Sequence, residues 1–141
     1  MRNQMSPAGQ YENGQTAYQN GDYETALRLF REAADKGETP AQYMIGCMYY
    51  HGEGVKQSYE EAARWFHMAA ELGHLGAQFS LGRMYECGRG LPRSIASAIK
   101  WYSLAADAGD RDAQLNLGLI YLNGEEVECN YAKAMDLLKV L

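Results

Sequence analysis

The chain has 141 residues, of which 47% are hydrophobic and 22% charged, and this composition is that of a folded globular domain and excludes disordered and fibrous chains. Its net charge of -5, with 13 basic residues scattered among 18 acidic ones, excludes the clustered positive surface of a nucleic-acid-binding protein. No apolar run approaches the roughly 20 residues that cross a bilayer, so we expect no membrane insertion; the polar N-terminus predicts a cytoplasmic protein, or a periplasmic one whose signal peptide was removed.

After a polar tail at residues 1–6, residues 7–40 have the pattern of two helices joined by a short turn. Their small and aromatic residues are spaced 12, 4 and 3 residues apart, at Gly14, Ala26, Phe30 and Ala33. This spacing is similar to that of the tetratricopeptide repeat, a helical hairpin of 34 residues.

Residues 41–76 match residues 77–112 when the chain is slid by 36 residues. The matching positions are Ala41, Gly46, Tyr49, Gly52, Gly54, Ala62, Trp65, Ala69 and Gly73, which recur as Ala77, Gly82, Tyr85, Gly88, Gly90, Ala98, Trp101, Ala105 and Gly109. Repetition at this period predicts a solenoid, in which each unit buries its apolar face against its neighbours. A third copy, 113–141, is incomplete because it ends before its second helix does.

Each copy reads as two helices with defined ends. Ala41, Ile45, Met48 and Tyr49 form one apolar stripe of the first helix. The second helix begins after a residue that can accept from free backbone N–H groups, and in successive repeats this residue is Asp22, Ser58, Ser94 and Asn130. Ser58 with Glu61 predicts a capping box. The same helices end at Gly37, Gly73 and Gly109, and the loop between the helices carries the glycine pairs Gly52, Gly54 and Gly88, Gly90.

Two tryptophans and two histidines lie on or beside the second helices. We expect Trp65 and Trp101 to fill the space between hairpins, each burying roughly 150–250 Å². His67 and His74 are expected to face solvent.

Together these motifs resemble the Sel1-like repeat, a relative of the tetratricopeptide repeat with a longer loop between its helices. The resemblance covers 41–141 closely and 7–40 in its tetratricopeptide form, within one solenoid domain. It implies an all-α, right-handed α/α superhelix and a non-enzymatic adaptor that binds a partner protein or peptide. In bacteria, similar chains are signalling scaffolds, secretion or polysaccharide-export components, and immunity proteins that neutralise a toxic effector.

By similarity to tetratricopeptide repeats, the first helix of each hairpin lines a concave groove. Four rows of groove positions supply the candidate partner-binding residues: Tyr43, Cys47, Tyr50, His51, Phe79, Arg83, Glu86, Cys87, Leu119 and Leu122, with Leu115 and Asn123 in the same rows. The row of Tyr43, Phe79 and Leu115 stays apolar, whereas the other three rows change chemistry between repeats. Such a groove would take an extended segment or a helix, with aromatic anchors and an arginine as contacts. The apolar Leu119 and Leu122 predict that a further repeat, a second subunit in a homo-oligomer or the partner covers the C-terminal end.

The alternative to an adaptor is a small-molecule or thiol-dependent catalyst. Cys47 and His51 stand four residues apart, and Cys87 occupies the His51 position one repeat later, but three ligands fall short of the four of a structural zinc site. With Cys129, the cysteines are odd in number and lack a C-x-x-C pair, which predicts free thiols in a reducing compartment, or one disulfide in the periplasm. Some cysteine-rich relatives of this family have been associated with β-lactam binding, but their regularly paired cysteines are absent here. No catalytic motif is present, so the sequence predicts no enzyme, no cofactor and no metal.

Overall fold

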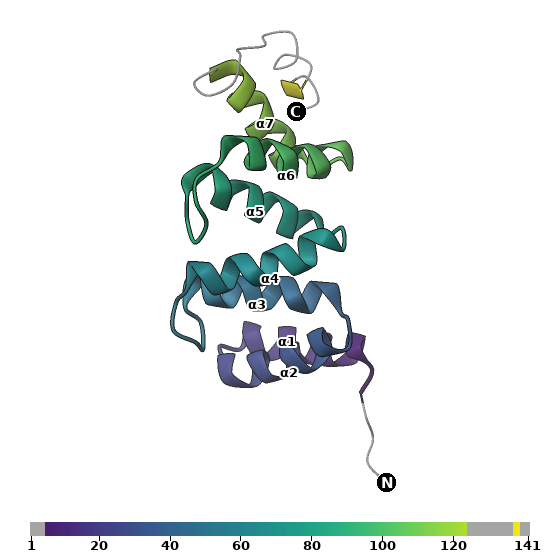
Figure 1. The fold of residues 1–141 in the computed structure, drawn as a ribbon. Helices are drawn as coiled ribbons and strands as arrows, with labels where there is room; N and C mark the ends of the chain where they lie inside the picture. The colour runs from purple at the N-terminus through teal and green to yellow at the C-terminus, as the bar shows by residue number, and fades with distance from the viewer. Residues whose placement is uncertain (1–4, 124–136, 139–141) are drawn as a thin grey trace. The chain divides into compact units, whose positions relative to one another are not determined.

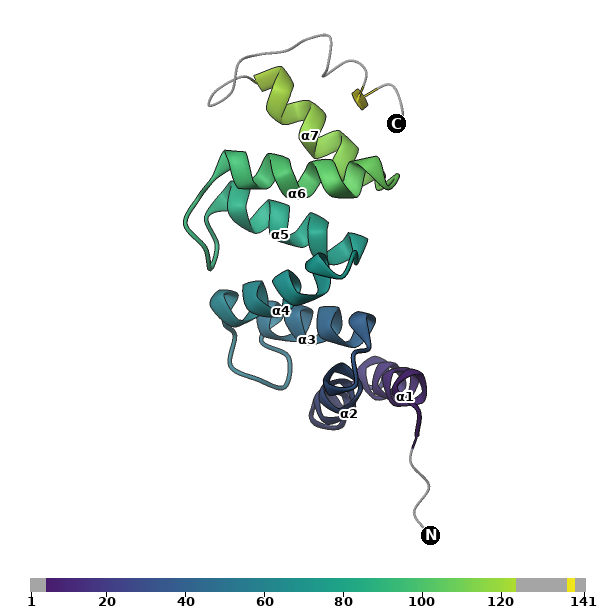
Figure 2. The ribbon, with the colours of Figure 1, turned by 45° about the vertical axis from the view of Figure 1, so that its right-hand side comes forward.

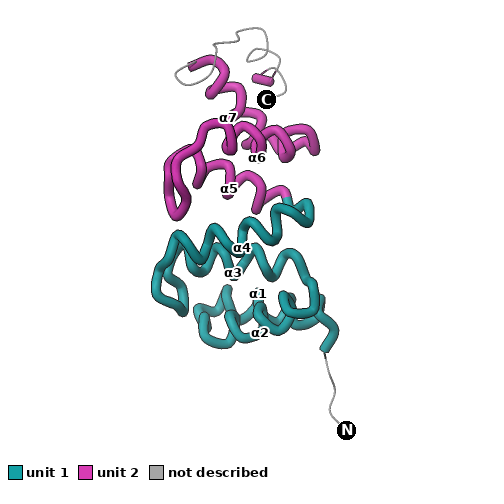
Figure 3. The backbone as a smooth tube through the Cα atoms, viewed as in Figure 1, with its two compact units in different colours: residues 1–74 teal, residues 75–141 magenta. Residues whose placement is uncertain are grey.

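The computed structural model describes residues 5–123 and 137–138, and this part of the chain contains α-helices and no strand. The seven helices have 13 residues each: α1 (Pro7–Gln19), α2 (Tyr23–Asp35), α3 (Thr39–His51), α4 (Tyr59–Glu71), α5 (Leu75–Cys87), α6 (Ile95–Asp107) and α7 (Arg111–Asn123). They form two compact units, residues 1–74 and residues 75–141, coloured separately in Figure 3. The all-α repeat fold predicted from the sequence is confirmed.

The first unit consists of two helical hairpins. Figure 1 shows α1 beside α2 and α3 beside α4, and α2 also packs on α3. The core between them is a set of buried apolar side chains: Ala26, Leu27, Phe30, Ala33, Ala34, Ala41, Ile45 and Met48. Of the predicted stripe of the first helix, Ala41, Ile45 and Met48 are fully buried, and Tyr49 is half-buried against the same core.

The second unit repeats this arrangement from a new hairpin. Here α5 pairs with α6, and α6 packs on α7, as both Figure 1 and Figure 2 show. Its core is again made of buried side chains from successive helices: Ile95, Ala98, Tyr102, Ala105, Ala106, Ala113, Leu117 and Ile120.

The predicted caps hold the starts of the second helices. Side-chain oxygens of Asp22, Ser58 and Ser94 accept from backbone N–H groups three residues on, at 3.2, 3.1 and 3.1 Å. The fourth predicted cap, Asn130, lies outside the described residues.

The predicted capping box at Ser58 is wrong in its second half. The Ser58 backbone N–H donates to the carbonyl of Tyr49 at 2.9 Å, and the Glu61 carboxylate accepts from Arg64 at 2.9 Å. A hydrogen bond thus joins the start of α4 to α3, and because it uses the Ser58 N–H, this group is not left for Glu61 to accept from.

The loop and helix-end glycines adopt the backbone conformation that the sequence predicted. After the second helices, Gly37, Gly73 and Gly109 have φ of 88°, 91° and 97°. In the loop after α3, Gly52 ends the helix at φ 72°, and Gly88 has φ 71° at the corresponding place after α5. These values lie in the left-handed region, where other residues are strained.

A second class of glycine lies inside the first helices and receives an aromatic ring. A Cβ on Gly14, Gly46 or Gly82 would stand 2.7 Å from ring atoms of Phe30, Phe66 or Tyr102, respectively. These rings occupy one position of the second helix, 36 residues apart along the chain. The ring-on-glycine contact therefore joins the two helices of each of these hairpins.

The centre of these hairpins is filled by this ring, and the structure assigns Trp65 a lesser packing role than the sequence predicted. Trp101 is buried as predicted, but Trp65 is only half-buried and packs at the edge of the first unit's core. The neighbouring Phe66 is 2% exposed and fills the centre of its hairpin. Ala, Gly and Trp are identical between repeats, whereas the central ring is Phe in two hairpins and Tyr in one. A comparison of identical residues therefore does not reveal it.

Candidate binding site

The candidate residues on α3 form a half-buried aromatic surface in the first unit. The ring of Tyr43 packs on Phe66, with centroids 5.6 Å apart, and is stacked on His74 at 4.5 Å. His74 is thus half-buried, contrary to the expectation that it faces solvent, and burial lowers the pKa of its imidazole.

Two further candidates on α3, Cys47 and Tyr50, are also half-buried, whereas His51 is exposed. Burial is the main cause that raises the pKa of the Cys47 thiol to about 11. Tyr50 packs on Tyr59 of α4, with ring centroids 5.0 Å apart, and on His51 at 5.1 Å.

No group of three His, Cys, Asp or Glu side chains among the described residues is placed to hold a metal ion. Cys47 and His51 belong to the first unit, and Cys87 belongs to the second. Similarly, no helix in the described ranges is both long and apolar enough to cross a membrane.

On α5, Phe79 is a half-buried packing residue and Arg83 is exposed. Phe79 lies 5.8 Å from the ring of Tyr102, and the Arg83 guanidinium stands 5.9 Å from the centroid of Phe79. The last residue of the helix, Cys87, is exposed.

Glu86 on α5 accepts a hydrogen bond from a buried tyrosine. The Tyr102 hydroxyl donates to Glu86 Oε1 at 2.7 Å and accepts from Asn116 Nδ2 at 3.3 Å. Burial, together with the bond to this carboxylate, raises the pKa of Tyr102 above its usual value, so the hydroxyl keeps its proton and remains a donor.

Three leucines of α7 form an exposed apolar row, whereas Leu117 is buried in the core. Leu115, Leu119 and Leu122 are 38%, 47% and 37% exposed, at the i, i+4 and i+7 positions of one helix face. Two of them, Leu119 and Leu122, meet Glu86 across a pocket of about 530 Å³.

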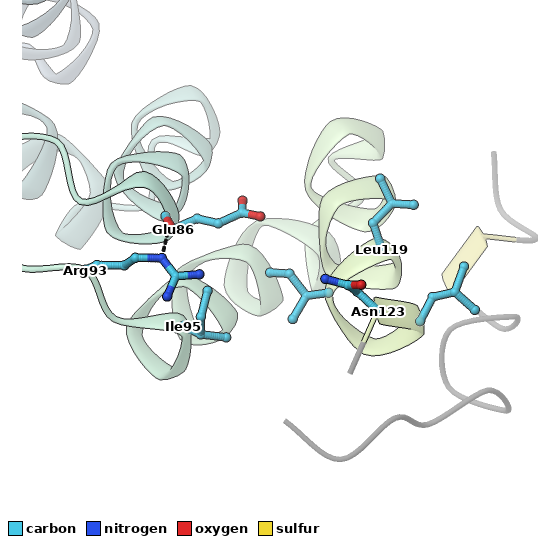
Figure 4. Close-up of a pocket in the computed structure, with 7 residues that line it drawn as sticks. Glu86, Arg93, Ile95, Leu119 and Asn123 are labelled. Carbon is cyan, nitrogen blue, oxygen red and sulfur yellow. Dashed lines mark hydrogen bonds between the residues drawn. The ribbon is translucent and has the colours of Figure 1, made fainter. Parts of the chain in front are cut away.

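This pocket, shown in Figure 4, is built by α5, the start of α6 and α7. Seven described residues line it: Glu86, Arg93, Ile95, Leu119, Ile120, Leu122 and Asn123. The Glu86 side chain points from α5 toward α7, and Arg93 Nε donates to the backbone carbonyl of Glu86 at 3.0 Å. The pocket thus combines four aliphatic side chains with one carboxylate, one guanidinium and one amide.

The pocket lies at the corner of its hairpin where the end of the first helix meets the start of the second. The same corner of the first two hairpins carries a pair of packed rings. In the first hairpin, Tyr18 packs on Tyr23 with ring centroids 5.2 Å apart, and in the second Tyr50 packs on Tyr59 in the same way. The corresponding residues of the third hairpin are Glu86 and Ile95. Because a carboxylate and an isoleucine replace a pair of rings, the described side chains leave space at this corner.

The structure therefore brings three of the predicted residues together, Glu86, Leu119 and Leu122, with Asn123 beside them. It leaves Arg83 and Cys87 exposed on α5, outside the pocket lining. Three lining residues were missed: Arg93, Ile95 and Ile120. Arg93 and Ile95 lie outside the first helices, and Ile120 stands at the position of the core residues Met48 and Met84, which stays apolar across these three repeats. The signal for Ile95 was present in the sequence, since the residue after the cap is Tyr23, Tyr59 and Tyr131 in the other repeats.

Comparison with known proteins places these units among helical repeats. A family model described as Sel1 repeat matches residues 7–38, 39–74, 76–110 and 111–139. The first segment, expected to be tetratricopeptide-like, is matched by the same family model as the other three.

Two solved structures are similar over nearly the whole chain. A protective antigen of uropathogenic Escherichia coli with an SLR fold is 35% identical, with a TM-score of 0.91 over 96% of this chain and 30% of its own. A Sel1 repeat protein from Oxalobacter formigenes is 34% identical, with a TM-score of 0.86 over 92% of this chain and 53% of its own.

One curated protein, an exopolysaccharide production negative regulator of Rhizobium leguminosarum bv. viciae, is 37% identical over 54 residues. The stretch is 38% of this chain and 20% of the regulator. The chain thus spans about half of the Oxalobacter protein's length, and the matches cover less than a third of the antigen and of the regulator.

Proposed function

The chain belongs to the Sel1 repeat family, whose members generally mediate protein–protein interactions, and from this premise we propose that it binds a segment of a partner protein in the pocket between α5 and α7. The observation that carries the proposal is that the pocket stands where a repeated ring pair is replaced. In a repeat protein the constant positions maintain packing, so a departure that opens space is a candidate for recognition.

The chemistry of the lining suits a protein segment. Leu119 and Leu122 offer exposed apolar area, and Glu86 and Arg93 stand beside it as polar groups that can orient a backbone or side chain. Binding sites commonly combine apolar walls with a few such polar groups. The partner would contribute apolar side chains to the leucine row and hydrogen bonds to the charged pair.

The properties of Cys47 do not favour the alternative of thiol-dependent catalysis. The thiolate is the nucleophile of cysteine chemistry, and a pKa of about 11 leaves the Cys47 thiol protonated at neutral pH. Proteins of the Sel1 repeat family are generally scaffolds, in keeping with a binding role.

The test is capture of partner proteins by the tagged chain in its native host, compared between two matched variants. Leu119→Asp places a charge in the pocket, whereas Leu104→Asp places the same charge on α6 at nearly equal exposure, 47% against 46%. We expect a specific partner to be lost with Leu119→Asp and retained with Leu104→Asp. Equal recovery with both variants would count against the pocket as the binding site.

A further inference from the structure

We propose that Glu86 makes the pocket selective for a cationic side chain, that of a lysine or arginine in an extended segment of the partner. This inference rests on the proposed function and specifies the chemistry that the pocket recognises.

The carboxylate of Glu86 is held in place by a chain of hydrogen bonds. Asn116 donates to the hydroxyl of Tyr102, and this hydroxyl donates to Glu86 Oε1 at 2.7 Å. Tyr102 is fully buried, so its hydroxyl is a fixed donor. A carboxylate whose position is set before binding loses less conformational freedom when it meets a cation.

The carboxylate and its donor occur together in one hairpin. At the position of Glu86 the first two hairpins have Tyr18 and Tyr50, and at the position of Tyr102 they have Phe30 and Phe66. Packing against glycine needs only the ring, as Phe30 and Phe66 show. The added hydroxyl of Tyr102 is therefore explained by the carboxylate that it orients.

The walls of the pocket suit the hydrocarbon part of a long basic side chain. Ile95, Leu119 and Leu122 line the space beside Glu86. Lysine and arginine bury their methylene stems on such apolar surface while the charged end reaches a polar group. Apolar surroundings also strengthen the attraction between opposite charges relative to open water.

Arg93 is the group that would favour an anion instead. Its Nε is engaged by the backbone carbonyl of Glu86, which ties the guanidinium to the end of α5. The protein as a whole carries a net charge of -5, which attracts cationic segments over a longer range. These two facts favour a basic occupant, and an acidic one is the competing outcome of the test.

The experiment is a titration of the full chain with four capped amino acids. Binding is monitored by the NMR chemical shifts of the Leu119 and Leu122 methyl groups. The probes are Nα-acetyl amides of lysine, arginine, norleucine and glutamate, which present a cation, an unbranched neutral chain that lacks the charged end, or an anion. We expect the lysine and arginine probes to bind most tightly and to shift both methyl groups.

Three variants separate charge from shape. Glu86→Gln keeps the acceptor for Tyr102 and should weaken the cationic probes about five- to tenfold while leaving norleucine within about twofold. Tyr102→Phe restores the ring of the other hairpins and should lower the preference for cation over norleucine about two- to threefold, which a purely structural role would not do. The double variant Glu86→Tyr, Ile95→Tyr restores the ring pair, so all probes should lose their pocket shifts.

Three results overturn the proposal: tighter binding of the glutamate probe, equal affinities for all four probes, or no pocket shifts with either cationic probe. Each is distinguishable from failure of the proposed function. A partner whose capture depends on Leu119 but not on Glu86 would support the binding site and refute its selectivity, whereas independence from both residues would refute both.

Discussion

Adding one methyl group at Gly46 tests the ring-on-glycine contact of the second hairpin. In Gly46→Ala the new Cβ would lie 2.7 Å from Cδ1 and Cε1 of Phe66 and 3.3 Å from Cγ. Carbon atoms pack at about 3.5–4.0 Å, so the ring must withdraw by roughly 1 Å. Phe66 is 2% exposed, and its surroundings leave it no open side.

The expected loss of stability follows from two opposing terms. Overpacking of a well-filled core costs about 1–3 kcal/mol, and a ring with no open side places Gly46→Ala near the upper end. Alanine gains about 1 kcal/mol over glycine inside a helix. The net destabilisation is therefore about 2 kcal/mol, which corresponds to a fall in Tm of about 5–10 °C in a chain of this size.

Thermal unfolding followed by circular dichroism at 222 nm measures this fall. The matched control is the same change in a Phe66→Leu background, which imitates Gly118, where a Cβ would meet Leu138 at 3.0 Å. In the Phe66→Leu background, Gly46→Ala should lower the stability much less, because a leucine side chain shifts more easily than a ring. A Gly46→Ala protein as stable as the wild type, or more stable, would refute the contact.

Three further predictions use the same structure. Trp65→Ala should cost about 3 kcal/mol in a denaturant titration, because a large ring at the edge of the first unit's core is removed; a loss below about 1 kcal/mol would contradict the repeat register. Ser58→Ala should lower stability by about 1 kcal/mol through loss of the cap, while Ser103→Ala inside α6 should be neutral or slightly stabilising. In a Cys129→Ser background, iodoacetamide at pH 8 should modify exposed Cys87 well before Cys47, and the Cys47 rate should rise about tenfold per pH unit toward its pKa of about 11, because burial disfavours its thiolate. Comparable rates at pH 8, measured by mass spectrometry of the peptides, would contradict the burial of Cys47.

The fold was largely predictable because it depends on local signals repeated at a fixed interval. The caps Asp22, Ser58 and Ser94 and the left-handed glycines each follow from one residue and its backbone needs. The second half of the Ser58 capping box was not predictable. The Ser58 backbone N–H, which would have donated to Glu61, donates instead to the carbonyl of Tyr49, nine residues earlier in α3.

The candidate site was predictable only in part, for a physical reason. Sequence comparison along the first helices found Glu86, Leu119 and Leu122, which change chemistry between repeats. A pocket is made by several elements, however, and the contributions of Arg93 and Ile95 come from the loop and start of α6. The hydrogen bond from Tyr102 to Glu86 depends on a single hydroxyl added to a ring that is otherwise buried for packing.

In the third hairpin, different residues hold the helices together and line the pocket. The ring of Tyr102 packs on Gly82, whereas Glu86 and Ile95 line the pocket. An aromatic ring packs on the helix glycine equally closely in the two hairpins that carry a pair of tyrosines and in the one that carries Glu86 and Ile95. A duplicated hairpin could therefore acquire a new ligand preference through three substitutions, the pair at 86 and 95 and the hydroxyl of Tyr102, while inheriting its architecture intact. For protein engineering, positions 86 and 95 can be varied to change ligand preference while the ring that joins the two helices stays on its glycine.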